Sequence, residues 1–281
     1  MDAPIFGISR HRILRDGQGI VTLVAFSSCP LRCLYCLNPH CRDLASENFQ
    51  IMMPHDLFQD LLIDDLYFRT TGGGITFGGG EPLLYSSFIK SFSEICPDEW
   101  KIRLETSLNV PNSNLKLIAD KIDEFIVDIK DLNDTIYFRY TNKHNEQVIG
   151  NLEYLAELGL QDKTLIRLPL IPDFNSAQDI KASRKFLIDM GFHRFDQFNY
   201  INTLEEKPLN ADECMTNGMN WNKITCEALK RVRSAIADHY GINFSPAKCD
   251  ILICPDEPCP GCEAEMKWLT ETISNKYDNR L

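Results

Sequence analysis

The residues best suited to chemistry in this sequence are three cysteines near its start, Cys29, Cys33 and Cys36, at C-x3-C-x2-C spacing. They directly follow an apolar run, residues 20–26, whose β-branched and large apolar side chains predict a buried strand. Three thiolates this close together can surround one compact metal centre. Because [4Fe–4S] clusters are normally held by four cysteines, a set of three would leave one iron open to a substrate or cofactor.

Two other interpretations of this loop are compatible with the residues alone. Structural zinc usually has four protein ligands, and Cys41 or His40 could supply the fourth. The cysteines could also be buried thiols that bind no metal. The spacing favours the iron–sulfur centre over both.

A glycine-rich stretch, residues 71–82, predicts a short strand over 74–77 between two glycine runs. Glycine permits close backbone approach, so the second run, with Gly79, Gly80 and Glu81, can present bare N–H and C=O groups to a ligand. No lysine follows, and Glu81 would repel phosphate, so an ammonium group or a neutral polar edge fits better. The structural alternative is a glycine-rich turn between a strand and a helix.

Four further cysteines lie close to the C-terminus. They are interrupted by three prolines and a glycine, which predicts a metal-binding loop rather than a helix or strand. A second [4Fe–4S] cluster and structural zinc both suit a four-thiolate set, and unligated thiols are the third interpretation. The four residues are Cys249, Cys254, Cys259 and Cys262.

The elements that must position these groups alternate between strand and helix, which implies right-handed βαβ units and a parallel sheet. About six units fit the pattern, so the predicted α/β fold is a partial (βα)6 TIM-like barrel over residues 1–245, followed by a cysteine-rich metal-binding tail over 246–281. The sequence predicts strands over 74–77, 100–106, 124–130, 164–171, 194–201 and 242–244, a helical turn over 135–140, and helices over 54–68, 83–95, 112–122, 145–158, 177–190 and 227–239.

Composition excludes several classes of protein. The chain has 281 residues and a formal net charge of −11, which disfavours nonspecific binding to nucleic acid. No apolar run reaches about 18 residues, and no signal peptide is apparent, so neither a membrane span nor export is expected. Eleven cysteines without an export signal indicate metal sites or free thiols in a reducing, cytoplasmic compartment.

Polar residues fall where three of the predicted strands end, and such strand ends carry the chemistry of these barrels. Lys130 and Arg167 could hold a carboxylate. Glu105 and Asp128 could bind a cation or pair with those two bases. Glu81 and Lys130 are expected at a solvent-accessible rim.

Together, the C-x3-C-x2-C loop and the Gly-Gly-Gly-Glu-Pro turn resemble the radical S-adenosylmethionine (SAM) superfamily. The resemblance implies that the three cysteines hold a [4Fe–4S] cluster whose fourth iron binds the amino and carboxylate groups of SAM. One electron then cleaves the sulfonium, giving methionine and a 5′-deoxyadenosyl radical that takes a hydrogen atom.

Residues 10 to 205 further resemble the glycyl-radical-enzyme activating enzymes. The similarity includes Asp16-Gly-Gln-Gly, the segment from Leu31 to Pro39, Leu104-Glu105-Thr106 and Asp128-Ile-Lys130. Such enzymes take a hydrogen atom from a glycine Cα of a large protein partner, and the electron is expected from a flavodoxin- or ferredoxin-type reductant. By this resemblance Asp16 would contact the substrate peptide.

The resemblance also implies the residues that bind the cofactor. A monovalent cation beside SAM would be held by Asp128, Glu105 and Thr106. The expected cofactor contacts are Tyr35, Gly79, Gly80, Glu81, Glu105, Thr106, Asp128, Lys130, Arg167 and Tyr200.

The sequence departs from the activase pattern in several places. Asn199-Tyr200-Ile201 stands where these enzymes often have Pro-Tyr-His, Gln18 replaces a proline, and Leu37 stands where a polar residue is common. The C-terminal cysteines are more typical of radical enzymes that modify ribosomal peptides, so a peptide or small-molecule modifying enzyme is the alternative function. A zinc-bearing binding or scaffold protein is a third hypothesis, from a different class.

Overall fold

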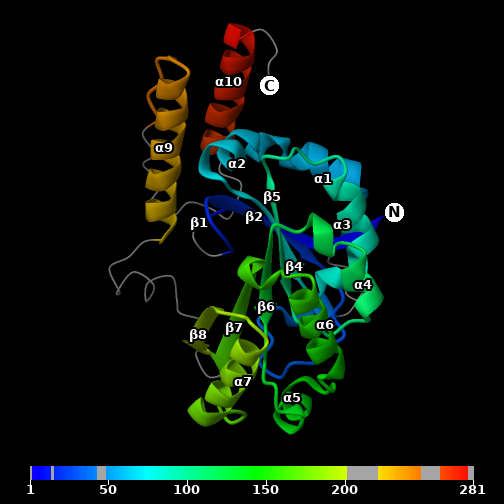
Figure 1. Ribbon diagram of the computed structural model, residues 1–281. Coiled ribbons are helices and arrows are strands. Elements are labelled where there is room, and N and C mark those ends of the chain that lie inside the picture. Colours follow the sequence, from blue (N-terminus) through cyan, green and yellow to red (C-terminus); the bar gives the residue numbers. More distant parts are fainter. Residues whose placement is uncertain (1, 14–15, 43–48, 201–220, 248–259, 278–281) are drawn as a thin grey trace.

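The computed structural model describes residues 2–13, 16–42, 49–200, 221–247 and 260–277 (Figure 1). Its centre is a sheet of eight strands in the order β3-β1-β2-β4-β5-β6-β7-β8, open because β3 and β8 stand at its two edges. The strands are β1 (Ala3–Ile13), β2 (Ile20–Phe26), β3 (Gln50–Met52), β4 (Gly74–Gly79), β5 (Lys101–Thr106), β6 (Glu124–Asp128), β7 (Thr164–Leu170) and β8 (Arg194–Asn199).

Six of these strands, β2 and β4 to β8, run parallel, and β1 and β3 are antiparallel additions at one edge. The first glycine run allows β4 to begin in a crowded position between β2 and β5. A Cβ at Gly73 would lie 1.9 Å from the carbonyl oxygen of Ile20, and one at Gly74 would lie 2.1 Å from that of Lys101. The parallel pairing of β2 and β4 to β8 confirms the predicted partial barrel of six parallel strands.

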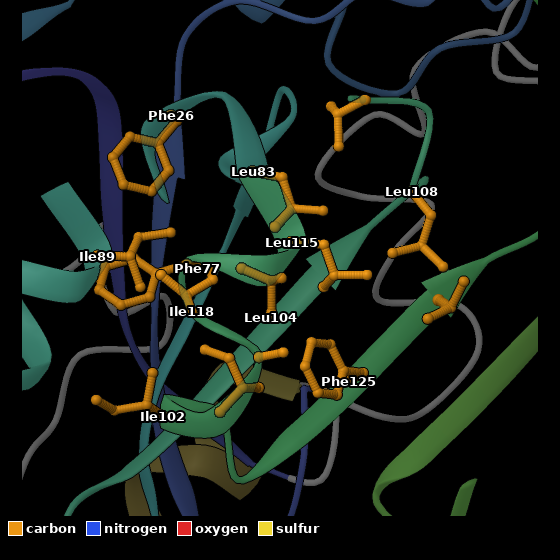
Figure 2. Close-up of a cluster of buried hydrophobic side chains, with 14 of the residues drawn as sticks. Phe26, Phe77, Leu83, Ile89, Ile102, Leu104, Leu108, Leu115, Ile118 and Phe125 are labelled. Atoms are coloured by element: carbon orange, nitrogen blue, oxygen red, sulfur yellow. The ribbon is translucent and has the colours of Figure 1, made fainter. Parts of the chain in front are cut away.

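The helices that follow the strands cover the outer face of the sheet (Figure 1). Figure 2 shows the resulting core, in which Phe77, Leu104 and Phe125 of β4, β5 and β6 face Leu83, Ile89 and Leu115 of the covering segments. The α-helices are α1 (Pro54–Leu61), α2 (Asp65–Thr71), α3 (Ser86–Ser93), α4 (Asn112–Lys116), α5 (Asp134–Thr141), α6 (Glu146–Glu157), α7 (Ala177–Asp189), α9 (Trp221–His239) and α10 (Pro260–Tyr277), and the 3-10 helices are η1 (Pro39–Arg42), η2 (Leu62–Asp64), η3 (Pro82–Tyr85), η4 (Ala119–Lys121) and η5 (Gln161–Lys163).

Helices α9 and α10 lie side by side at the end of the sheet where the parallel strands begin, which we call the base (Figure 1). A second apolar cluster joins them to Ile20, Leu66 and Tyr67. Buried charged and aromatic side chains accompany this cluster. We call them the base network: Arg10, His11, Asp64, Tyr67, Arg233 and Glu265.

Several predicted boundaries were wrong. The predicted strand over 242–244 is absent from the sheet, because the amide of Ile242 caps α9 by bonding to the carbonyl of Ala237. The predicted helix over 54–68 is interrupted by η2, and the helices over 83–95 and 112–122 each include a 3-10 segment. Within the described residues, no helix combines the length and apolar character needed to cross a membrane.

Three elements were not predicted. β1 carries Arg10, His11 and Arg12 near its end, which hides its apolar pattern, and β3 is only three residues long. Helix α10 begins at Pro260, inside the segment expected to be a loop, because proline is well tolerated in the first turn of a helix.

Candidate functional site

The three-cysteine loop leaves the C-terminal end of β2, at the end of the sheet that we call the mouth. Ser28 takes a left-handed conformation, with φ of 78°, and its amide donates to the carbonyl of Cys41 at 2.5 Å, which closes the loop on itself. The amide of Arg32 donates to the carbonyl of Thr141 at 2.8 Å, at the end of α5. The backbone of the loop is therefore fixed at both its start and its centre.

The thiols of this loop have the burial expected of cluster ligands. Cys33 is buried, and Cys29 and Cys36 are half-buried. Burial raises the pKa of Cys29 to about 12 and that of Cys33 to about 11, while the ammonium group of Lys130 opposes the rise at Cys33. A cationic group is thus close enough to stabilise the thiolate that iron requires.

A zinc site in this loop has less support. Among the described residues, which include Cys41 and His40, no three His, Cys, Asp or Glu side chains gather closely enough to hold a single metal ion. The thiols of a [4Fe–4S] cluster bind different irons and need not converge on one point. The donor set, three thiols on one short loop, fits that cluster.

The glycine turn is attached directly to the cysteine loop. The amide of Gly80 donates to the carbonyl of Phe26 at 2.8 Å, and the amide of Glu81 donates to that of Ser28 at 2.8 Å. A Cβ at Gly80 would lie 2.1 Å from the carbonyl oxygen of Ser28, so this close approach requires glycine. The expectation of bare N–H groups was wrong for these two residues, because their amides hold the loop.

Glu81 is not at the rim: its side chain is fully buried, at 0% exposure. Its carboxylate accepts hydrogen bonds from the hydroxyl of Thr106 at 2.6 Å, and from the hydroxyl and amide of Ser107 at 2.6 and 2.9 Å. Burial raises the pKa of Glu81, while these bonds act in the opposite direction. Glu81 therefore ties the glycine turn to the end of β5, a contact through Ser107 that the sequence did not reveal.

The charged residues of the mouth form ion pairs, one at the end of β6 and others between neighbouring parts of the sheet; we call them the mouth pairs. Lys130 Nζ lies 2.6 Å from Asp128 Oδ2, and Arg167 lies 2.6 Å from Glu105 Oε1 and 3.7 Å from Asp196 Oδ2. The expectation that these acids pair with the bases is confirmed; Asp196 was not predicted. Burial would lower the pKa of Lys130, but the charge and hydrogen bond of Asp128, together with the negative form of Cys33, raise that pKa. Burial raises the pKa of Glu105.

Tyr200 connects the last strand to the cysteine loop. Its hydroxyl donates to the carbonyl of Tyr35, and burial raises its pKa. The ring of Tyr35 packs edge-on against Tyr140 and Phe174, with centroids 6.0 and 5.7 Å away. The cysteine loop therefore spans the mouth from β2 to β8.

Asp16 lies inside the barrel rather than on the surface. It pairs with Arg12, and its carbonyl accepts a hydrogen bond from the hydroxyl of Thr76 at 2.9 Å. The negative charge of Asp16 contributes to the raised pKa of Glu105, so the two carboxylates are near neighbours.

The C-terminal cysteines fall largely outside the described residues. Cys249, Cys254 and Cys259 lie there, so the metal site expected at this tail stays a prediction. Cys262 is buried on the first turn of α10, at the base. Burial raises the pKa of Tyr67, and the negative form of Cys262 would add to that rise.

Comparisons with known proteins point to one superfamily. The model of the radical SAM superfamily matches residues 23–187. The pyruvate formate-lyase 2-activating enzyme of Escherichia coli (strain K12) is 30% identical over 237 residues, covering 70% of this chain and 80% of that enzyme. The (2S)-3-sulfopropanediol dehydratase activating enzyme of Klebsiella oxytoca is 29% identical over 246 residues, covering 66% of this chain and 77% of that enzyme.

Among solved structures, Streptococcus suis SuiB bound to the precursor peptide SuiA superimposes with a TM-score of 0.52 and 18% identity. The match covers 82% of this chain and 48% of SuiB, so the chain spans about half of that protein. At this identity the likeness shows the fold alone.

Proposed function

Because the chain belongs to the radical SAM superfamily, whose members use a [4Fe–4S] cluster and SAM, we propose that it is a glycyl-radical-enzyme activating enzyme. Two relatives at 29–30% identity are activating enzymes by name, and they support this choice within the superfamily. The observation that carries the proposal is the three-cysteine loop, fixed by the glycine turn at the mouth of the partial barrel.

In this proposal Cys29, Cys33 and Cys36 hold the cluster. A bound cluster would supply one electron to SAM, whose cleavage would give methionine and the 5′-deoxyadenosyl radical that takes the hydrogen atom. The protein's part is to hold the loop in place through the backbone bonds of Ser28 and Arg32, and to place the ammonium group of Lys130 beside Cys33.

The mouth pairs would bind the charged methionine part of SAM. Lys130 has 11% of its side chain exposed and would receive the carboxylate while Asp128 keeps the ammonium group charged. Arg167 would add a second cationic group. The other proposed contacts are Tyr35 and Tyr200, the backbone of Gly79 and Gly80, and Glu105, whereas Glu81 and Thr106 would act by supporting the turn.

Further cofactors and the substrate contact remain part of the proposal. A monovalent cation would be held by Asp128, Glu105 and Thr106, and a second cluster or zinc by the C-terminal cysteines. Asp16 would act from within the barrel, below the glycine-bearing peptide. The proposed reaction needs a low-potential electron and reduced iron, and both are kept in a reducing compartment. We therefore propose that the protein acts in the cytoplasm.

The test begins with anaerobic reconstitution and addition of dithionite and SAM. We expect 5′-deoxyadenosine to form, and the Cys29→Ala variant to form none. Adding a candidate glycyl-radical enzyme labelled with deuterium at the glycine Cα should transfer deuterium into 5′-deoxyadenosine and give an organic radical signal in electron paramagnetic resonance (EPR) spectra.

The outcomes distinguish the functions considered. Deuterium in 5′-deoxyadenosine together with a stable protein radical supports an activase. Cleavage of SAM with label transfer only from a short precursor peptide would replace it with a peptide-modifying enzyme. A protein that binds zinc in the N-terminal loop and cleaves no SAM would contradict both.

A further inference from the structure

The cysteine loop exposes large apolar side chains beside its metal ligands. Leu34 is 56% exposed and Leu37 is 61% exposed, on either side of Cys36. Exposed apolar residues gathered beside a functional group indicate a surface that another molecule covers.

Basic side chains lie on this loop and on the end of α5, to which the loop is hydrogen-bonded. Arg32 is exposed on the loop, and Arg42 is half-buried and donates to the carbonyl of Cys33 at 3.3 Å. Arg139 and Lys143 are exposed at the end of α5. We call these six residues the loop patch: Arg32, Leu34, Leu37, Arg42, Arg139 and Lys143.

The charge of the loop patch is opposite to that of the chain. Residues 27–42 contain no Asp or Glu, whereas the whole chain carries a net charge of −11. Two acidic neighbours in the described residues are each bonded: Asp134 pairs with His144 at 2.8 Å, and Asp173 accepts from the hydroxyl of Tyr35 at 3.4 Å. The patch is therefore a local cationic surface on an acidic protein.

We propose that the loop patch is the docking surface for an acidic one-electron carrier protein. This inference rests on the proposed function, which consumes one electron for each SAM that is cleaved. The rate of electron transfer falls steeply with distance, so the carrier must dock where the cluster ligands approach the surface. The half-buried Cys36, flanked by exposed Leu34 and Leu37, marks that position.

The chemistry of the step is simple. The reduced carrier gives up one electron and leaves oxidised by one electron, and no bond forms between the proteins. That electron is the one that cleavage of the sulfonium consumes. Opposite charges on the two proteins, at the rim of their interface, accelerate their encounter. The leucines exclude water at the centre of that interface.

The test compares two reductants on the same enzyme. One is dithionite, a small molecule that needs no docking surface, and the other is an acidic bacterial flavodoxin kept reduced by its NADPH-dependent reductase. Arg32→Glu and Leu37→Glu are measured with both, alongside a matched control, Lys185→Glu, on the exposed surface of α7. The readouts are reduction of the cluster, followed by its visible absorbance and EPR signal, and formation of 5′-deoxyadenosine.

We expect both loop variants to match the wild type with dithionite. With flavodoxin at low salt, their rate of cluster reduction should fall about tenfold, since reversing a rim charge acts mainly on the association rate. Added salt should slow the wild type and shrink its advantage over Arg32→Glu. Lys185→Glu should behave as the wild type with both reductants.

Two results would overturn the docking proposal. Unchanged flavodoxin-driven reduction in both loop variants would show that the carrier docks elsewhere. Normal reduction by flavodoxin, with weaker binding of a candidate glycyl-radical enzyme, would assign the patch to that partner instead. If the wild type cleaves no SAM even with dithionite, the proposed function itself fails, a result separable from both.

Discussion

Both ends of the sheet carry charged side chains, but those at the base are sealed while those at the mouth are partly open to solvent. At the base, the buried Arg10 pairs with Asp64, which is 1% exposed, and the buried Arg233 pairs with Glu265, which is 15% exposed. At the mouth, the carboxylates are more exposed, at 25% for Asp128, 29% for Glu105 and 49% for Asp196. Similar residue types thus stabilise the fold at one end and leave groups available for a ligand at the other.

The largest effect that we expect is at the mouth. Cys33→Ala removes one of three ligands, so reductive cleavage of SAM should be lost while the fold persists. Production of 5′-deoxyadenosine by the reconstituted variant measures this. Cys96→Ala, at a half-buried thiol away from the loop, is the control and should remain active. Wild-type production by Cys33→Ala would remove the cluster from this loop.

Substitution in the base network should lower the stability of the fold rather than the binding of SAM. Asp64→Asn leaves Arg10 and His11 without their buried carboxylate, and breaking such a pair costs about 3–5 kcal/mol of unfolding free energy. Urea unfolding measures this. Affinity for SAM, per folded molecule, should not change. A loss of affinity for SAM without a loss of stability would contradict the assignment of the base to stability and the mouth to ligand binding.

The same residue predicts a pH dependence. Burial alone would raise the pKa of Asp64, but its bonds to His11 and the charge of Arg10 together lower it below the ordinary value. The stabilisation it provides is therefore present above the unfolded-state pKa and is lost as the pH falls through the folded-state pKa. Wild-type stability should fall more steeply with acid than that of Asp64→Asn.

Lys130→Met tests the mouth pairs. Loss of a charged hydrogen-bond donor to the SAM carboxylate should weaken binding by about tenfold to a hundredfold. The unfolding free energy should change by no more than about 1 kcal/mol, because solvent can reach Asp128. Isothermal titration with SAM measures the affinity; a variant that unfolds readily yet binds SAM normally would mark Lys130 as structural.

The smallest expected effect concerns Tyr200. Tyr200→Phe keeps the ring but removes the hydroxyl that bonds to the Tyr35 carbonyl, a change of about 1 kcal/mol. The EPR line shape of the reduced cluster should shift, since the loop between its ligands loses a contact with β8. An unchanged spectrum together with unchanged stability would show that this bond does not position the loop.

The sequence predicted the parts of this molecule that local pattern determines. The strands β2 and β4 to β8, and the cysteine and glycine motifs, are visible in the sequence without any tertiary information. The rest depends on contacts between distant segments. The burial of Glu81 arises because Thr106 and Ser107 meet it from β5, and Asp196 lies in a strand whose exposed residues gave no functional signal.

The bonding of Gly80 and Glu81 to the end of β2 has a consequence for how the enzyme matures. The segment proposed to receive iron and the segment proposed to face the cofactor are joined by two backbone hydrogen bonds, so order in one supports order in the other. Iron insertion should then slow amide hydrogen exchange at the end of β4 as well as in the cysteine loop.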